Sequence, residues 1–209
     1  MIEYFDLAFE GIDGSGKTTQ AELLIKRLVE ELMPVRFWHY TAKDNFWGNM
    51  IKACYSEDVP APIRCVRQSR YFQETLYALS SRASYKKAKS GEGNVLIADR
   101  SIVTAYASHL DLLPFWFLDL VEISAVPRTV LFLDVEPEQA FERIENRKGR
   151  LCDENLGELI NFKGAYERIM GSERPSTLRN TRFIRVDGQR DERIIADEIY
   201  GLVKHEVLK

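Results

Sequence analysis

Short apolar runs of strand-forming residues alternate along this chain with longer segments of helical period. The expected strands are Leu7–Glu10, Val35–Tyr40, Val95–Ala98, Thr129–Val135 and Phe183–Val186. Segment Lys17–Leu32 carries an apolar helical stripe of Ala21, Leu24, Leu28 and Leu32, and a similar stripe runs from Ile195 to Val203. Strands that alternate with helices are typical of a parallel α/β sheet. We therefore expect a single α/β domain over residues 1–209, with a five-stranded parallel sheet and helices on both faces.

The segment Pro114–Ile123 is apolar on almost every side of the helix that its pattern predicts. A helix of this kind is buried either in the protein's own core or against another subunit. The sequence leaves both interpretations open, and the second would make the segment part of a dimer interface.

Composition restricts the partners that the chain is expected to have. Its formal net charge of −3 gives no excess of basic residues for a nucleic-acid backbone. The longest apolar run, Leu112–Leu118, is far too short to span a bilayer, and the chain begins without a basic head or a signal-type apolar stretch. The cysteines Cys54, Cys65 and Cys152 form no close pair, which is typical of a reduced setting. We expect a cytoplasmic protein with no nucleic-acid partner and no membrane partner.

A phosphate-binding loop follows the first expected strand. Residues 11–18 read GIDGSGKT and match the pattern GxxxxGK[ST] without a mismatch, between an apolar strand and a helix. Its glycines allow tight turns in which backbone N–H groups point at phosphate oxygens, and the helix adds the positive end of its dipole. Lys17 is expected to contact the β- and γ-phosphates, and the Thr18 hydroxyl to bind Mg²⁺. The expected ATP-binding residues are Gly11, Asp13, Gly14, Ser15, Gly16, Lys17, Thr18, Thr19 and Arg143. The fold class is thus a three-layer P-loop NTPase fold.

A second polar motif, Asp99-Arg100-Ser101, directly follows the third expected strand. Ligands of parallel α/β sheets bind beyond the carboxyl ends of the strands. At such an end an aspartate can hold the magnesium shell, and an arginine can bind the phosphate of an acceptor. GTPases carry a DxxG segment after a later strand and an NKxD-type segment that binds the base. Neither appears in this sequence, so the pattern favours a kinase. The expected metal-binding residues are Thr18 and Asp99.

Basic residues cluster after the helix that follows the fourth strand: Arg143, Arg147, Lys148 and Arg150. Arginines that close over a γ-phosphate stabilise the charge that spreads over its oxygens during transfer, and they exclude water. We expect these side chains to form a lid at about residues 146–153. The expected catalytic residues are Lys17, Arg100, Arg147 and Arg150.

These segments resemble the thymidylate kinase family. The likeness rests on Phe9–Gln20 (FEGIDGSGKTTQ), Ile97–Arg100 (IADR) and Leu131–Pro137 (LFLDVEP), and it extends over most of the chain. The resemblance implies a five-stranded parallel sheet, a homodimer, and Mg²⁺-dependent transfer of the γ-phosphoryl group of ATP to thymidine monophosphate (dTMP), giving dTDP. It also implies that Asp13 binds the 3′-hydroxyl of the acceptor's sugar, that Asp99 lies near Mg²⁺, and that Arg100 holds the acceptor's phosphate. Direct in-line transfer without a covalent intermediate is the expected mechanism.

The acceptor side departs from that family's pattern. Residues 41–44 read TAKD in place of a Thr-Arg-Glu-Pro type segment, and Ser108 and His109 stand where a Tyr-Gln pair is expected. The family's base-reading arginine has no clean counterpart, because Arg82 fits only if its helix is about a turn shorter. His39, His109 and His205 show no metal-binding spacing and are expected to be structural.

The same region resembles a second group on this fold, the deoxynucleoside kinases. Segment 71–74 (YFQE) is similar to their helix in which a glutamine binds the base, and Asp99-Arg100-Ser101 is similar to their acidic-Arg-Ser motif. In this alternative Asp44 is the general base for a nucleoside hydroxyl. Gln73 binds the base edge, and Phe72 or Tyr71 stacks on the base. The expected acceptor-binding residues are Asp13, Asp44, Phe72, Gln73 and Arg100. The sequence therefore predicts phosphorylation of dTMP, with a deoxynucleoside as the alternative acceptor.

Overall fold

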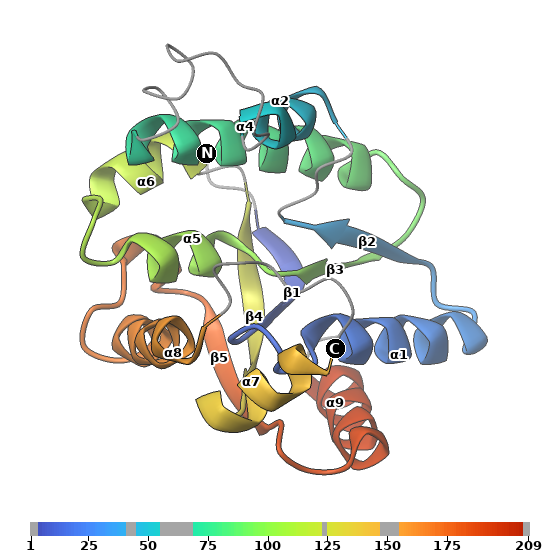
Figure 1. Ribbon diagram of the computed structural model, residues 1–209. Coiled ribbons are helices and arrows are strands. Elements are labelled where there is room, and N and C mark those ends of the chain that lie inside the picture. Colours follow the sequence, from blue (N-terminus) through green and yellow to red (C-terminus); the bar gives the residue numbers. More distant parts are fainter. Residues whose placement is uncertain (1–3, 41–44, 55–68, 123–124, 147–154, 207–209) are drawn as a thin grey trace.

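The structure is a five-stranded parallel sheet between two layers of helices (Figure 1). The computed structural model describes residues 4–40, 45–54, 69–122, 125–146 and 155–206. The strands are β1 (Tyr4–Glu10), β2 (Val35–His39), β3 (Val95–Asp99), β4 (Val126–Asp134) and β5 (Arg182–Asp187). They lie in the order β2-β3-β1-β4-β5, and each neighbouring pair is parallel. The predicted fold class and the five predicted strands are confirmed, with bounds that differ from the prediction by at most three residues.

Helices α1 (Lys17–Glu30) and α9 (Glu192–Glu206) cover one face of the sheet. The other face is covered by α4 (Arg70–Lys89), α5 (Ile102–His109), α6 (Phe115–Glu122) and α8 (Leu156–Met170). The remaining helices of the described ranges are α2 (Phe46–Cys54), α7 (Pro137–Glu145) and the short 3-10 helix η1 (Ser176–Leu178). None of the helices in the described ranges is long and apolar enough to cross a membrane.

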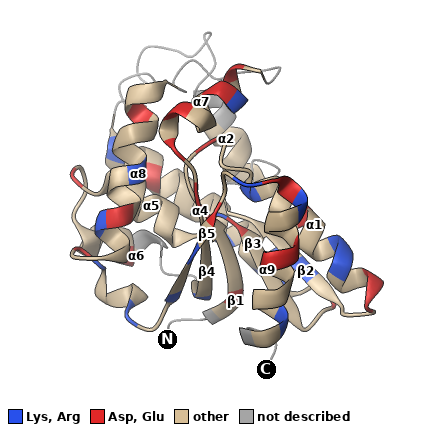
Figure 2. Ribbon diagram, turned by 90° about the horizontal axis from the view of Figure 1, so that it is seen from below, with Lys and Arg blue, Asp and Glu red and all other residues tan. Residues whose placement is uncertain are grey.

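Two apolar cores result from the alternation of side chains along the strands. In β4, Leu131 and Leu133 pack beneath α1 and α9, whereas Val130 and Phe132 pack beneath α5 and α8. Because both faces of the strand are covered, β4 is apolar nearly throughout, as is typical of strands in a parallel sheet. Figure 2 shows that charged residues of both signs are interspersed along α1, α8 and α9.

Helix α6 has two different sides. Leu118 is fully buried, and Phe115 and Phe117 pack partly against the core, but Trp116 and Leu120 are 66% and 68% exposed. Burial of this segment in the core on all sides, one of the two interpretations of its sequence, is therefore wrong. One side of α6 belongs to the core, and the other is an apolar surface.

The register of the sheet determines where the two polar motifs meet. Phe9 of β1 pairs with Asp99 of β3, so the loop after Glu10 and the motif at Asp99–Ser101 leave the sheet side by side. Both lie at the carboxyl ends of their strands, where parallel α/β sheets bind their ligands. Gln20, in the first turns of α1, donates to the Glu192 carbonyl at the start of α9, which fixes the helix behind the loop.

Candidate active site

The loop after β1 depends on glycine at two positions. Gly14 has a φ of 80°, and a Cβ there would lie 2.3 Å from the Ala140 carbonyl oxygen. Gly11 has a φ of 142°, and its Cβ would lie 2.7 Å from the Leu133 oxygen. Residues other than glycine rarely adopt such backbone conformations. The added Cβ atoms would also contact backbone oxygens that have little room to move. The loop can therefore fold closely against β4 and α7 only with glycine at both positions.

Helix α1 begins immediately behind this loop. Its N-cap is Gly16, which has no side chain to bond the first N–H groups of the helix. Those N–H groups and the positive end of the helix dipole are available to an anion. Lys17 lies at the same place, and its Nζ donates to the Ile12 carbonyl at 2.7 Å. Burial lowers the pKa of Lys17 to about 8, and the charge of Arg100 acts in the same direction.

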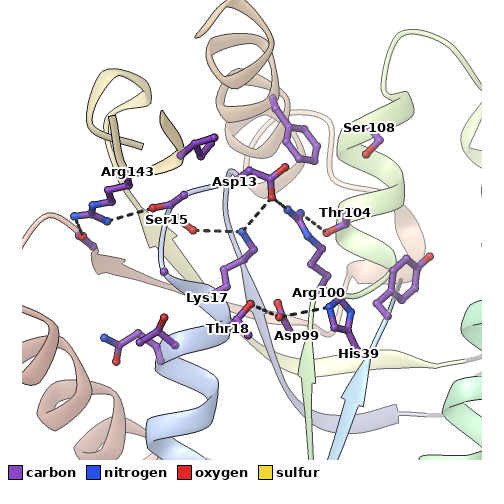
Figure 3. A pocket seen from close by; sticks show the side chains of 18 of the residues that line it. Asp13, Ser15, Lys17, Thr18, His39, Asp99, Arg100, Thr104, Ser108 and Arg143 are labelled. Atoms are coloured by element: carbon purple, nitrogen blue, oxygen red, sulfur yellow. Dashed lines mark hydrogen bonds and ion pairs between the residues drawn. The ribbon is translucent and has the colours of Figure 1, made fainter. Parts of the chain in front are cut away.

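Oxygen ligands suited to magnesium lie next to the loop (Figure 3). The Thr18 hydroxyl donates to Asp99 Oδ2 at 2.6 Å, and the carboxylate of Asp99 is almost fully buried. His39 Nε2 lies 3.9 Å from the same oxygen. Hydroxyl and carboxylate oxygens are the hard ligands that Mg²⁺ prefers, and such sites complete the shell with water and substrate phosphates. The two predicted metal-binding residues are thus adjacent, and their chemistry fits the ion.

Arg100 lies opposite Lys17, with Asp13 between them. Its backbone is left-handed, with a φ of 68°, and this turn directs the guanidinium across the end of β3. The guanidinium binds the carboxylate of Asp13 and lies 5.9 Å from the ring centre of Phe162. It also donates to the hydroxyls of Thr104 and Tyr166, each at 3.4 Å. A planar fork with these fixed partners can bind a phosphate through two of its N–H groups.

Behind Arg100 lies a fully buried carboxylate, that of Glu10 at the end of β1. It accepts three hydroxyl hydrogen bonds, from Ser101 at 2.6 Å, Thr104 at 2.7 Å and Tyr166 at 2.8 Å. Burial raises the pKa of Glu10, whereas the three hydroxyls and the charge of Arg100 oppose that rise. Since Thr104 and Tyr166 bond both Glu10 and Arg100, they connect the carboxylate to the guanidinium. The network fixes the position of Arg100 from the inside of the protein.

The phosphate-binding loop, Asp99 and Arg100 line one cavity of about 1050 Å³. One end of the cavity is formed by Arg143, Gly188 and Arg190, and Arg143 is held there by the carbonyls of Gly14 and Gly188 at 3.4 and 3.1 Å. The opposite end, beyond Arg100, is formed by side chains of α4 and α5 together with Tyr40. The phosphate-binding loop lies between the two ends. The cavity can therefore hold two phosphorylated ligands that meet above the loop.

Most of the residues expected on the phosphate side line this cavity: Asp13, Gly14, Ser15, Gly16, Lys17, Thr18, Thr19, Asp99, Arg100 and Arg143. Gly11 does not line it, and its place is in the turn beneath the loop. Asp44, Arg147 and Arg150 lie outside the described residues, as does the expected lid from residue 147 onward.

On the acceptor side the structure differs from what the sequence favoured. Phe72 and Gln73 are not among the residues that line the cavity, and the lining side chains of α4 are those of Glu74 and Tyr77. The helix begins at Arg70, so Phe72 and Gln73 lie in its first turn, beside the stripe that faces the cavity. Arg82 does not point into the cavity either, because its guanidinium donates to the Leu120 carbonyl of α6.

Sequence reasoning also missed Glu10 and Tyr166. Glu10 is a charged residue at the end of an apolar strand, which is a detectable signal for a buried, partnered group. Its partners Thr104 and Tyr166 lie 94 and 156 residues away, so that only the folded structure brings them together.

A phosphate-binding loop with magnesium-type ligands, facing an arginine across the same cavity, defines a P-loop phosphotransferase. The family model for thymidylate kinase matches residues 9–199. The thymidylate kinase of Leptospira interrogans is 30% identical over 204 residues, which cover 92% of this chain and 90% of the relative.

Two probable thymidylate kinases match nearly the full length of the chain at lower sequence identity. That of Pyrococcus horikoshii is 28% identical over 216 residues, covering 100% of this chain and 99% of its own. That of Sulfolobus acidocaldarius is 24% identical over 203 residues, covering 95% and 96%. The chain belongs to the thymidylate kinase family.

Proposed function

We propose that the protein transfers the γ-phosphoryl group of ATP to dTMP and produces ADP and dTDP. The observation that carries the proposal is the pair of cationic groups in one cavity, Lys17 in the phosphate-binding loop and Arg100 opposite it. Lys17 and the N–H groups at the start of α1 suit the phosphates of ATP. The fork of Arg100 suits the monophosphate of the acceptor. Family membership supports thymidine as the nucleoside.

The expected chemistry is a direct in-line displacement. An oxygen of the acceptor's phosphate forms a bond to the γ-phosphorus of ATP, and the bond from that phosphorus to the β–γ bridging oxygen breaks. The electron pair of the broken bond leaves with ADP. Because the attacking phosphate oxygen is already anionic, the reaction needs no general base. Lys17, Arg100 and Arg143 orient the triphosphate of ATP and the monophosphate of the acceptor. Such positioning is the main requirement of this chemistry.

Magnesium is part of this proposal as the partner of ATP. Thr18 would bind the ion directly, and Asp99 would bind it or its water shell, since their oxygens lie together beside the loop. The ion would neutralise charge on the β- and γ-phosphates. Arg147 and Arg150 stay predicted lid residues, which are expected to act on the same phosphates.

The test is ADP release measured with ATP and Mg²⁺, with dTMP, dUMP, thymidine and deoxycytidine supplied in turn. Turnover with dTMP and none with nucleosides supports the proposal, and the reverse result would overturn it. Lys17→Ala should abolish turnover and leave the fold intact, which circular dichroism would verify. Lys26→Ala, on the same helix and outside the cavity, is the matched control and should keep full activity.

A deoxynucleoside kinase is not favoured by the structure. That alternative depended on Phe72 and Gln73 at the base, and neither lines the cavity. Its general base, Asp44, lies outside the described residues.

We also propose that the protein works as a homodimer in the cytoplasm. The exposed side of α6 supports the dimer, since Trp116 and Leu120 lie four residues apart on one helix face and are both more than half exposed. Sedimentation velocity should give the mass of a dimer for the wild type, and Trp116→Glu should shift it to a monomer. Ile194→Glu alters an exposed apolar residue of α9 and should leave the dimer unchanged. A monomeric wild type would contradict this part of the proposal.

A further inference from the structure

The end of the cavity beyond Arg100 has no assigned role. The proposed function places the acceptor's phosphate at Arg100, and the inference below depends on that placement. The sugar and the base must then extend away from the phosphate-binding loop, toward the end formed by α4 and α5. That end presents Glu74 and Tyr77 from α4, and Ser108 and His109 from α5. The base of the acceptor therefore meets a wall that contains a carboxylate and an imidazole.

Glu74 and His109 form a pair across this wall. His109 Nε2 lies 2.5 Å from Glu74 Oε2, and the two side chains are only 15% and 5% exposed. An ion pair or strong hydrogen bond of this kind is an expensive way to hold two helices together, because both groups lose their hydration. Packed apolar side chains would hold the helices at least as well. A contribution to stability alone therefore does not explain why this pair lies in the cavity wall, and we look for another role.

The pair is also not satisfied by the protein alone. Among the described residues, His109 Nδ1 is buried and has no hydrogen-bond partner. Purely structural polar groups in protein interiors are nearly always paired. Glu74 Oε2 accepts from His109, and a carboxylate has room for further donors on its second oxygen. The carboxylate of Glu74 thus offers acceptor sites in the cavity, and His109 fixes its orientation.

We propose that Glu74, positioned by His109, recognises the acceptor's base by accepting a hydrogen bond from the N3–H of a pyrimidine imide. Thymine and uracil present a carbonyl, an N–H and a second carbonyl along this edge. A carboxylate is complementary to the central N–H group. Cytosine has an unprotonated ring nitrogen at the same place, so its lone pair would face a carboxylate oxygen. Such a site rejects a mismatched base because a buried polar group is left without its partner.

The experiment compares kcat/KM for dTMP, dCMP and dGMP in the wild type and in Glu74→Gln. A glutamine amide turns to offer either its oxygen or its NH₂, so it no longer excludes cytosine. We expect the dTMP-to-dCMP ratio of kcat/KM to fall by about tenfold or more in Glu74→Gln. Calorimetric binding of dTMP and dCMP without ATP should show the same change, and this measurement does not depend on turnover.

Two variants of His109 test its positioning role. His109→Gln keeps a donor for Glu74 and should keep most of the base selectivity, whereas His109→Leu should lose it. The matched control is Asp119→Asn in α6, a carboxylate outside the cavity that accepts hydroxyl hydrogen bonds from Tyr106 and Thr177. It should lower the melting temperature and leave the dTMP-to-dCMP ratio unchanged.

An unchanged ratio in Glu74→Gln, with a lower melting temperature, would overturn the inference and make the pair structural. That result would leave the proposed function intact, because wild-type turnover of dTMP tests it separately. A wild type that prefers dGMP, or that does not accept dTMP, would overturn the imide assignment together with the proposed function.

Discussion

Removal of one oxygen atom, by Tyr166→Phe, tests whether the buried network behind Arg100 stabilises the protein and orients the arginine. The Tyr166 hydroxyl is fully buried and donates to Glu10 Oε2 at 2.8 Å. It also lies 3.0 Å from the Thr104 hydroxyl and accepts from Arg100 at 3.4 Å. The substitution keeps the ring and its contacts with Phe132 and Phe162, so no large cavity forms. Its effect is therefore the loss of the hydrogen bonds.

The magnitude follows from the burial of the partner. Leaving a buried acceptor without its donor costs about 1–3 kcal/mol, and Glu10 is fully buried. For a chain of this size, about 2 kcal/mol corresponds to a fall in Tm of about 4–8 °C. Arg100 keeps Asp13 and Thr104 as partners, so we expect a moderate effect on binding, with the KM for dTMP rising by about threefold to tenfold.

Differential scanning calorimetry and steady-state kinetics measure the two effects. Tyr200→Phe is the matched control, since Tyr200 also donates to a carboxylate, that of Glu31, but at the protein surface. Water and salt screen such a contact, so its loss should change Tm far less. A shift for Tyr166→Phe no larger than that of the control would refute the reasoning. So would a large shift in Tm with an unchanged KM, because the network would then stabilise the fold without orienting Arg100.

Three further predictions concern the loop and its buried charges. The pKa of Lys17, which burial lowers to about 8, should rise when phosphates bind. ATP binding at pH 8.5 should therefore take up a proton, so the measured binding enthalpy should differ between two buffers of different ionisation enthalpy. An equal binding enthalpy in both buffers would contradict this prediction. Gly14→Ala should reduce ATP binding by more than tenfold because its Cβ would meet the Ala140 oxygen at 2.3 Å, and fluorescence titration with near-normal affinity would contradict this. Because the folded pKa of Glu10 is raised above 4.5, the folded state favours its protonated form, and this contribution to stability is lost as pH rises. In urea unfolding, the difference in the free energy of unfolding between the wild type and Glu10→Gln should thus shrink from pH 4.5 to pH 7.5. A difference that grows over this range would contradict the raised pKa of Glu10.

The phosphate side of the site was predictable because its chemistry is contiguous in the sequence. Residues 11–18 carry the loop, the lysine and the hydroxyl in one motif, and the strand before them and the helix after them are strongly patterned. The same is true of Asp99 and Arg100, which follow β3 directly. In a parallel sheet such motifs meet at the carboxyl edge, so their proximity follows from the topology.

The acceptor side was less predictable because it depends on helix rotation. Gln73 looked suitable for a base edge, but the neighbouring residue Glu74 faces the cavity, and one position along a helix turns a side chain by about 100°. His109 was expected to be structural because the histidines show no metal-binding spacing, and its contact with Glu74 appears only in the folded structure. The apolar pattern of α6 likewise does not separate a buried side from an exposed one, because large apolar residues lie on both sides of the helix.

The left-handed backbone at Arg100 has a consequence for the design of heat-resistant variants. Outside glycine this conformation is unfavourable by about 1–2 kcal/mol, and every folded molecule carries that strain at the residue that faces the acceptor. At position 100 glycine would relax the backbone, but it would also remove the guanidinium and its contacts with Asp13, Thr104 and Tyr166. Leu32 shares the same conformation, with a φ of 59°, but it is 92% exposed and does not line the cavity. Glycine at position 32 would release comparable strain at no cost to the chemistry, so thermal engineering of this protein should begin at that turn.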